Sequence, residues 1–144
     1  MAPPEISVRL RLAWVLALAL VLASAVVPAV AGPTEPRWTH DRTVVFTFAL
    51  TLIAMVSGIG SLALRETLVR TLAQGGVDPG TPQGAGYAAA MLLRAWALCG
   101  AVGLLGAFVA WVAAAPAFAL PFAAGATALL VFEAPRRSAL GPSR

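Results

Sequence analysis

The side chains of this chain that could bind a metal or a cofactor are few and scattered. The 144 residues include one histidine and one cysteine. His40 adjoins Asp41 in RWTHDR, but a structural zinc site needs four ligands and a catalytic site usually three. The histidine also lies outside the apolar runs, where haem ligands between helices would have to be. Cys99, as a single cysteine, excludes a cysteine-pair metal site. We therefore expect no metal and no cofactor.

No catalytic arrangement is visible either. No nucleophile adjoins a base, no two carboxylates pair, and the glycine-rich segment 75–86 lacks the lysine and the strand-to-helix context of a phosphate-binding loop. We predict that the chain is not an enzyme. Cys99 is expected to be a small apolar packing residue, with lipidation as the alternative.

Arg94 and Glu133 are the best candidates for a specific polar contact. Arg94 begins one apolar run and Glu133 ends the next. If the two runs form an antiparallel hairpin, both residues lie at the same membrane boundary, where an ion pair lowers the cost of holding charge near hydrocarbon. The alternative is that Arg94 reaches the lipid phosphates alone and Glu133 is solvated. In both cases the role is anchoring.

The composition indicates that the bilayer is the main partner of the chain. Hydrophobic residues make up 60% of it and charged residues 11%, against about 25% charged in soluble domains. Such a chain has too few polar side chains to cover a surface that faces water. The net charge is +4 and all ten basic residues are arginine. These arginines lie at the ends of apolar runs, not on one face, so we expect no nucleic-acid binding.

Four apolar runs are long enough to cross a bilayer, which needs about 20 residues. The predicted fold is therefore an all-α, single-domain bundle of four transmembrane helices. The predicted spans are residues 12–31, 44–64, 88–111 and 117–134, and residues 65–86 form a cytoplasmic loop that begins with a short interfacial helix.

The arginines orient this bundle. Four crossings place eight of them on one side: Arg9, Arg11, Arg65, Arg70, Arg94, Arg136, Arg137 and Arg144. Positive charge collects on the cytoplasmic side, so we predict a multi-pass inner-membrane protein with both termini in the cytoplasm. In the alternative, residues 9–31 form a signal peptide that is cleaved between Ala31 and Gly32, which leaves three spans.

Glycine and other small residues recur at intervals of three and four within the predicted spans. In lipid, helices associate through close backbone contact, which small residues allow. We therefore expect span 88–111 to pack tightly on span 117–134, with span 44–64 close by. The predicted helix-packing residues are Ala97, Gly100, Gly103, Gly106, Ala107, Ser57 and Gly60.

The segment 94–137 combines an opening arginine, this Ala/Gly series, a short turn and the ending Glu133-Ala134-Pro135-Arg136-Arg137. In these features it resembles the C-terminal hairpin of small uncharacterised four-span bacterial membrane proteins, which is similar to that of ATP synthase subunit c. The resemblance implies an acidic residue five positions after the arginine, where this chain has Cys99. Its acids all lie in loops, termini or span ends, so we expect no ion-binding carboxylate.

These observations favour a non-enzymatic structural or accessory subunit. It would pack against helices of other membrane proteins or against further copies of itself. The alternative is a small transport component or a diverged rotor-type protein without the ion-binding carboxylate.

Overall fold

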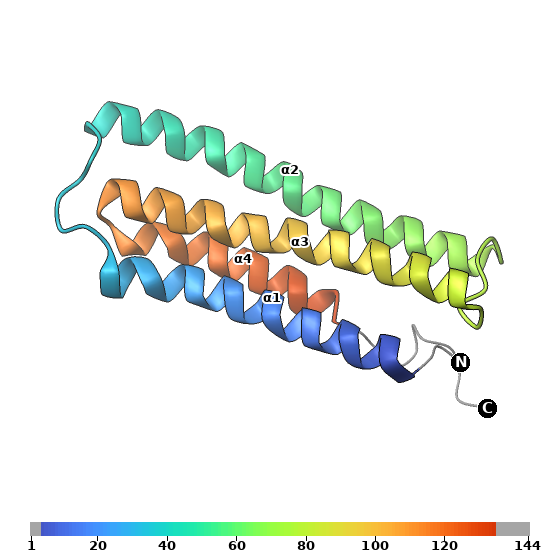
Figure 1. The fold of residues 1–144 in the computed structure, drawn as a ribbon. Coiled ribbons are helices and arrows are strands. Elements are labelled where there is room, and N and C mark those ends of the chain that lie inside the picture. The colour runs from blue at the N-terminus through green and yellow to red at the C-terminus, as the bar shows by residue number, and fades with distance from the viewer. Residues whose placement is uncertain (1–3, 135–144) are drawn as a thin grey trace.

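A computed structural model describes residues 4–134 as a bundle of helices that run alternately in opposite directions (Figure 1). Its elements are α1 (Pro4–Ala31), α2 (His40–Ala73), α3 (Pro82–Ala113), the 3-10 helix η1 (Pro116–Phe118) and α4 (Ala119–Phe132). The described residues include no strand. The predicted all-helical class is confirmed.

Three of the helices, α1, α2 and α3, are long and apolar enough to cross a membrane. They contain the predicted spans 12–31, 44–64 and 88–111. α2 is longer than expected, with 34 residues or about 51 Å at 1.5 Å per residue. It continues without a break to Ala73, so residues 64–73 do not form a separate interfacial helix.

The connection between α2 and α3 is correspondingly shorter than the predicted loop 65–86. Leu68 is buried, which extends the packing of α2 beyond residue 64. The Thr81 side chain then accepts a hydrogen bond from the Gly84 N–H at 3.1 Å. This N-cap, with Pro82 in the first turn, starts α3 six residues before the predicted span.

The fourth apolar run forms η1 and α4. α3 ends because Ala114 adopts a left-handed conformation with φ 49°, and Pro116 then begins η1. α4 has 14 residues, or about 21 Å, which is shorter than the hydrocarbon thickness of about 30 Å. The described residues thus contain three helices of spanning length and a shorter fourth.

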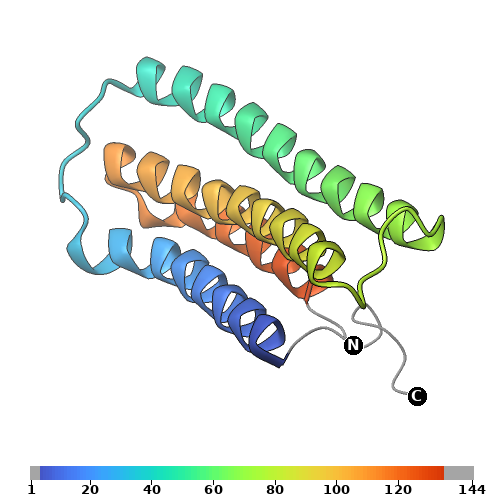
Figure 2. The same ribbon diagram turned by 45° about the vertical axis from the view of Figure 1, so that its right-hand side comes forward.

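α3 is the centre of the bundle. It packs against α1, α2 and α4, whereas α2 touches α4 only slightly, and no contact between α1 and α2 is found within residues 4–134. Figures 1 and 2 show α2 standing apart from α1 and α4 on the far side of α3. The largest fully buried side chains include Trp96 and Cys99 of α3, Leu130 of α4 and Val21 of α1.

The glycines of α3 face two different helices. A Cβ atom on Gly103 would lie 3.0 Å from Ser24 Oγ of α1, and one on Gly106 would lie 2.8 Å from Phe122 Cγ of α4. Gly100 also faces α1, through Leu20. Each step of three residues turns a helix by about 300°, so the series winds around α3 from one neighbour to the next. It does not form a single stripe toward α4.

The other residues expected at helix contacts lie in varied surroundings. A Cβ atom on Gly60 of α2 would lie 3.4 Å from Leu98 Cδ1 of α3. The Ser57 hydroxyl donates to the Ile53 carbonyl at 2.9 Å. Ala97 is exposed and Ala107 is half-buried.

We expect Gly106→Ala to destabilise the bundle, because the added methyl group meets the Cβ and ring of Phe122. Overpacking of this kind typically costs about 1–3 kcal/mol. The matched control is Gly125→Ala on α4, since a Cβ atom there meets nothing within 4 Å. Reversible unfolding in SDS measures both variants. Equal stability of the two would contradict the close contact between α3 and α4.

Candidate functional site

A groove runs between α2 and α4, where the two helices diverge. It contains two cavities, which meet at Thr51. The first, here called the open cavity, has a volume of about 510 Å³ and is lined by Pro36, Trp38, His40, Thr43, Val44, Thr47, Phe48, Thr51, Ala113 and Phe118. The second, the middle cavity, has a volume of about 310 Å³ and is lined by Thr51, Ala54, Met55, Gly58, Val102, Pro121, Phe122, Gly125 and Leu129.

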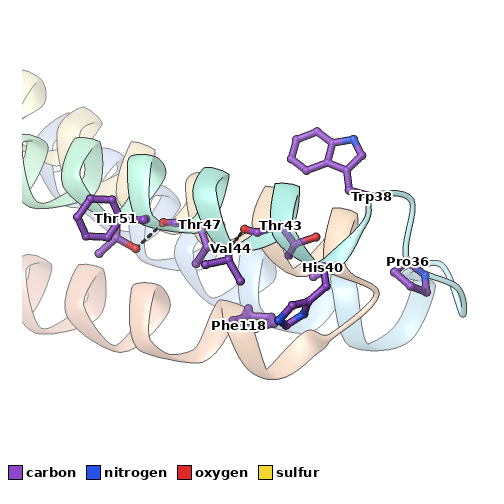
Figure 3. Close-up of a pocket in the computed structure, with 10 residues that line it drawn as sticks. Pro36, Trp38, His40, Thr43, Val44, Thr47, Thr51 and Phe118 are labelled. Carbon is purple, nitrogen blue, oxygen red and sulfur yellow. Dashed lines mark hydrogen bonds between the residues drawn. The ribbon is translucent and has the colours of Figure 1, made fainter.

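The open cavity has a polar rim. Figure 3 shows His40, at the start of α2, beside Phe118 of η1, with a row of threonines along α2. Each threonine donates its hydroxyl to the carbonyl one turn earlier: Thr43 to Thr39 at 3.1 Å, Thr47 to Thr43 at 2.7 Å and Thr51 to Thr47 at 2.7 Å. The row therefore offers methyl groups and remaining acceptor lone pairs to the cavity, but no free hydroxyl proton.

The middle cavity is apolar and shaped by two glycines. A Cβ atom added to Gly125 of α4 would meet nothing within 4 Å, so this position is open space. The groove is narrower at Gly58 of α2, where an added Cβ atom would lie 3.3 Å from Leu129 Cδ1. Larger residues at these positions would reduce the space between the helices.

A cationic side chain bridges α2 and α4 beyond the narrow point. The Arg65 guanidinium carbon lies 4.3 Å from the centre of the Phe132 ring, within the range of a cation–π contact. This contact joins α2 and α4 beyond the end of the groove that lies opposite His40.

A buried polar cluster lies next to this contact, formed by Ser61, Cys99 and Glu133. Glu133 follows α4 directly and is only 2% exposed. Its Oε2 atom lies 3.8 Å from Cys99 Sγ. The Ser61 hydroxyl donates to the Gly58 carbonyl at 2.8 Å, and the Arg65 guanidinium contacts the ring of Phe132, the residue before Glu133. Glu133 Oε1 has no hydrogen-bond partner within the described part of the chain.

Two tryptophan side chains, one on α1 and one on α3, have indole N–H groups in this part of the bundle. Trp14 Nε1 of α1 donates to the Leu130 carbonyl of α4 at 2.9 Å. Trp96 Nε1 of α3 is buried and has no partner among the residues that the structure describes.

The expected ion pair between Arg94 and Glu133 is not formed. Arg94 is exposed, whereas Glu133 turns inward to Cys99. Arg94 and Cys99 are five residues apart, which places them about 140° apart around α3. Within residues 4–134 the ion pair found is Arg70 with Glu66, in adjacent turns of α2. Glu133 is thus neither solvated nor paired with Arg94.

The remaining predicted residues lie as follows. Arg9, Arg11, Arg65 and Arg70 lie in the half of the bundle where α1 begins and α2 ends (Figure 1). Arg136 and Arg137 lie outside the described residues. His40 and Asp41 begin α2, and no group of three metal-binding side chains occurs in the described part of the chain.

Sequence reasoning missed the groove and the partners of Glu133. One signal was present: Thr43, Thr47 and Thr51 recur every four residues and so share one helix face. Pro121 and Gly125 have the same spacing on α4. The proximity of Ser61 and Arg65 to Glu133 has no local signal, because it depends on how α2 and α4 sit on α3.

Comparisons with known protein families, curated proteins and solved structures gave no match to the chain. Its role has to be inferred from its own geometry.

We expect a double-mutant cycle to couple Glu133 to Arg65 and not to Arg94. The substitutions are Glu133→Gln, Arg65→Gln and Arg94→Gln, each measured by unfolding in SDS. Groups in contact or in one polar network show interaction energies of about 0.5–3 kcal/mol, and independent sites add to within about 0.3–0.5 kcal/mol. Coupling to Arg94 with none to Arg65 would contradict the observed geometry.

Proposed function

We propose that the chain is a non-enzymatic, four-span protein of the bacterial inner membrane. It serves as a structural or accessory subunit and binds a helix of another membrane-embedded chain through α2. The observation that carries this proposal is the exposed apolar side of α2, which no helix of the bundle covers.

α2 joins the bundle through one side, which packs on α3. Its buried residues are Ala54, Ser61 and Leu68, spaced seven apart. The opposite side of the helix, here called the outward face, consists of Val45, Ala49, Leu52, Val56, Ile59 and Ala63, all of them exposed. Most of the circumference of this helix is therefore left to lipid or to a partner.

The outward face is suited to helix packing. Its residues are four, three, four, three and four positions apart. Contact residues with this alternating spacing are typical of helices that cross at about +20°. Most membrane bundles pack with this geometry. The face has no charged and no aromatic side chain, and Ala49 and Ala63 allow close approach. A second helix thus finds a regular, shallow surface along about 27 Å of α2.

A membrane span formed by α3 is supported by the levels of its interfacial residues. Arg94 and Trp111 are separated by about 26 Å along α3, close to the hydrocarbon thickness of about 30 Å. The half of the bundle with Arg9, Arg11 and Arg65 is assigned to the cytoplasm, because positive charge favours that side.

The packing of α1 supports its retention in the mature protein. Val21 and Ser24 lie against Gly103 of α3, and Trp14 donates a hydrogen bond to α4. Cleavage after Ala31 would remove these contacts and expose the glycine face of α3.

A binding role, as opposed to a catalytic one, is supported by the cavities. Neither is lined by an arginine, an acidic residue or a cysteine, and their one titratable lining residue is His40.

We expect Val56→Trp to disrupt assembly, because a bulky ring in the middle of the outward face prevents close helix contact. Leu16→Trp is the control, since it places the same ring on the exposed face of α1. Native electrophoresis after extraction in mild detergent should show a complex for the wild type and for Leu16→Trp, and a smaller species for Val56→Trp.

A photoreactive amino acid at the same two positions identifies the contact directly. The proposal predicts a defined cross-linked product from position 56 and none from position 16. A wild-type protein that migrates as a monomer and gives no product from position 56 would refute the accessory-subunit function.

A further inference from the structure

We infer that the groove between α2 and α4 binds one uncharged amphiphile with a long hydrocarbon tail. The head lies at His40 and Phe118, and the tail occupies the middle cavity. The chemical class is a neutral single-chain lipid whose head carries a hydroxyl or a carbonyl group. This inference concerns a different side of α2 from the outward face and does not depend on a partner helix.

The size of the groove suits a single hydrocarbon chain. The middle cavity has about 310 Å³ over the two turns of α2 from Thr51 to Gly58, and such a chain is much thinner than a helix. Both cavities fall within the range of about 300–1,000 Å³ that is typical of small-ligand sites.

The charge of the lining selects an uncharged head. Phosphate groups are usually held by arginine or lysine, and neither residue lines the cavities; a diphosphate probe tests whether the N–H groups that begin α2 at His40 hold an anionic head instead. The threonine hydroxyls already donate to backbone carbonyls. His40 can exchange a hydrogen bond with a hydroxyl or carbonyl head, and Phe118 offers an aromatic face beside it (Figure 3).

The direction of the groove selects a long tail. Its polar rim is at the His40 end, and its other end, at Gly58 and Leu129, is apolar. From Thr43 to Gly58 the groove follows α2 for about 22 Å, whereas one leaflet contributes only half of the hydrocarbon thickness of about 30 Å. A tail that fills the groove therefore passes the middle of the bilayer, and a chain of four isoprene units is a suitable probe of this length.

The test uses three probes with the same four-isoprene tail: geranylgeraniol, menaquinone-4 and geranylgeranyl diphosphate. Native mass spectrometry of the full chain, released from detergent, counts bound probe at increasing concentration. We expect a one-to-one adduct with the alcohol, the quinone or both, and at least tenfold weaker binding of the diphosphate. Which neutral head binds more tightly identifies the source of the ligand.

Variants locate the site. Gly125→Leu fills the open space on α4 and should weaken binding at least tenfold, and Met55→Trp should do the same from α2. The matched control is Gly86→Leu on α3, where an added Cβ also meets nothing within 4 Å but lies outside the groove. It should bind as the wild type does. His40→Ala should weaken binding several-fold, and Val56→Trp should leave it unchanged.

Several results would overturn the inference. Binding of the diphosphate as tightly as the alcohol and the quinone contradicts the uncharged head, and no adduct with any probe contradicts the site itself. Full binding by both Gly125→Leu and Met55→Trp places the ligand elsewhere. An equal loss in Gly86→Leu shows that binding is not specific to the groove, and an unchanged His40→Ala variant contradicts the position of the head.

Discussion

The close approach of α1 and α4 to α3 is the interaction on which the rest of the structure depends. In a bilayer, lipid tails are as apolar as leucine, so helices gain little from hiding apolar side chains and associate through close van der Waals contact. Gly103 allows this contact with Val21 and Ser24, and Gly106 allows it with Phe122. Because the glycines wind around α3, both neighbours are held by one helix. α2 lies outside this arrangement and packs extensively on α3, but along one side only.

The free faces of α2 connect the fold to the proposed roles. One side holds the helix to α3 through Ala54, Ser61 and Leu68. Another side borders the groove, and the outward face is left to lipid or to a partner. A helix that packs on all sides would have neither a groove nor a surface for assembly. The binding properties proposed here thus follow from the one-sided packing of α2, together with the contact of Arg65 and Phe132 that ties α2 to α4.

Much of the fold could be predicted from the sequence, and little of the site. The three long helices follow from long apolar runs, because hydrocarbon thickness and helix rise set the length that is needed. Their ends depend on local contacts that hydropathy does not report, such as the burial of Leu68 and the Thr81 cap. The sequence did not show in which direction each side chain points around its helix axis. Arg94 and Glu133 occupy the expected ends of their segments, but Glu133 faces Cys99 and Arg94 points away. The groove depends on the divergence of α2 and α4, which no single segment encodes.

The central claim is that the chain crosses the membrane four times, with the arginine-rich half of the bundle on the cytoplasmic side. The most direct measurement is the location of both ends in one uncleaved protein, with reporters that are active on only one side of the membrane. Four crossings predict that a fluorescent protein is fluorescent when it is fused to either terminus, and that alkaline phosphatase fused to the C-terminus is inactive. The mass of the intact protein should include residues 1–31. An active C-terminal phosphatase on an uncleaved chain with a cytoplasmic N-terminus would show an odd number of crossings and contradict the account.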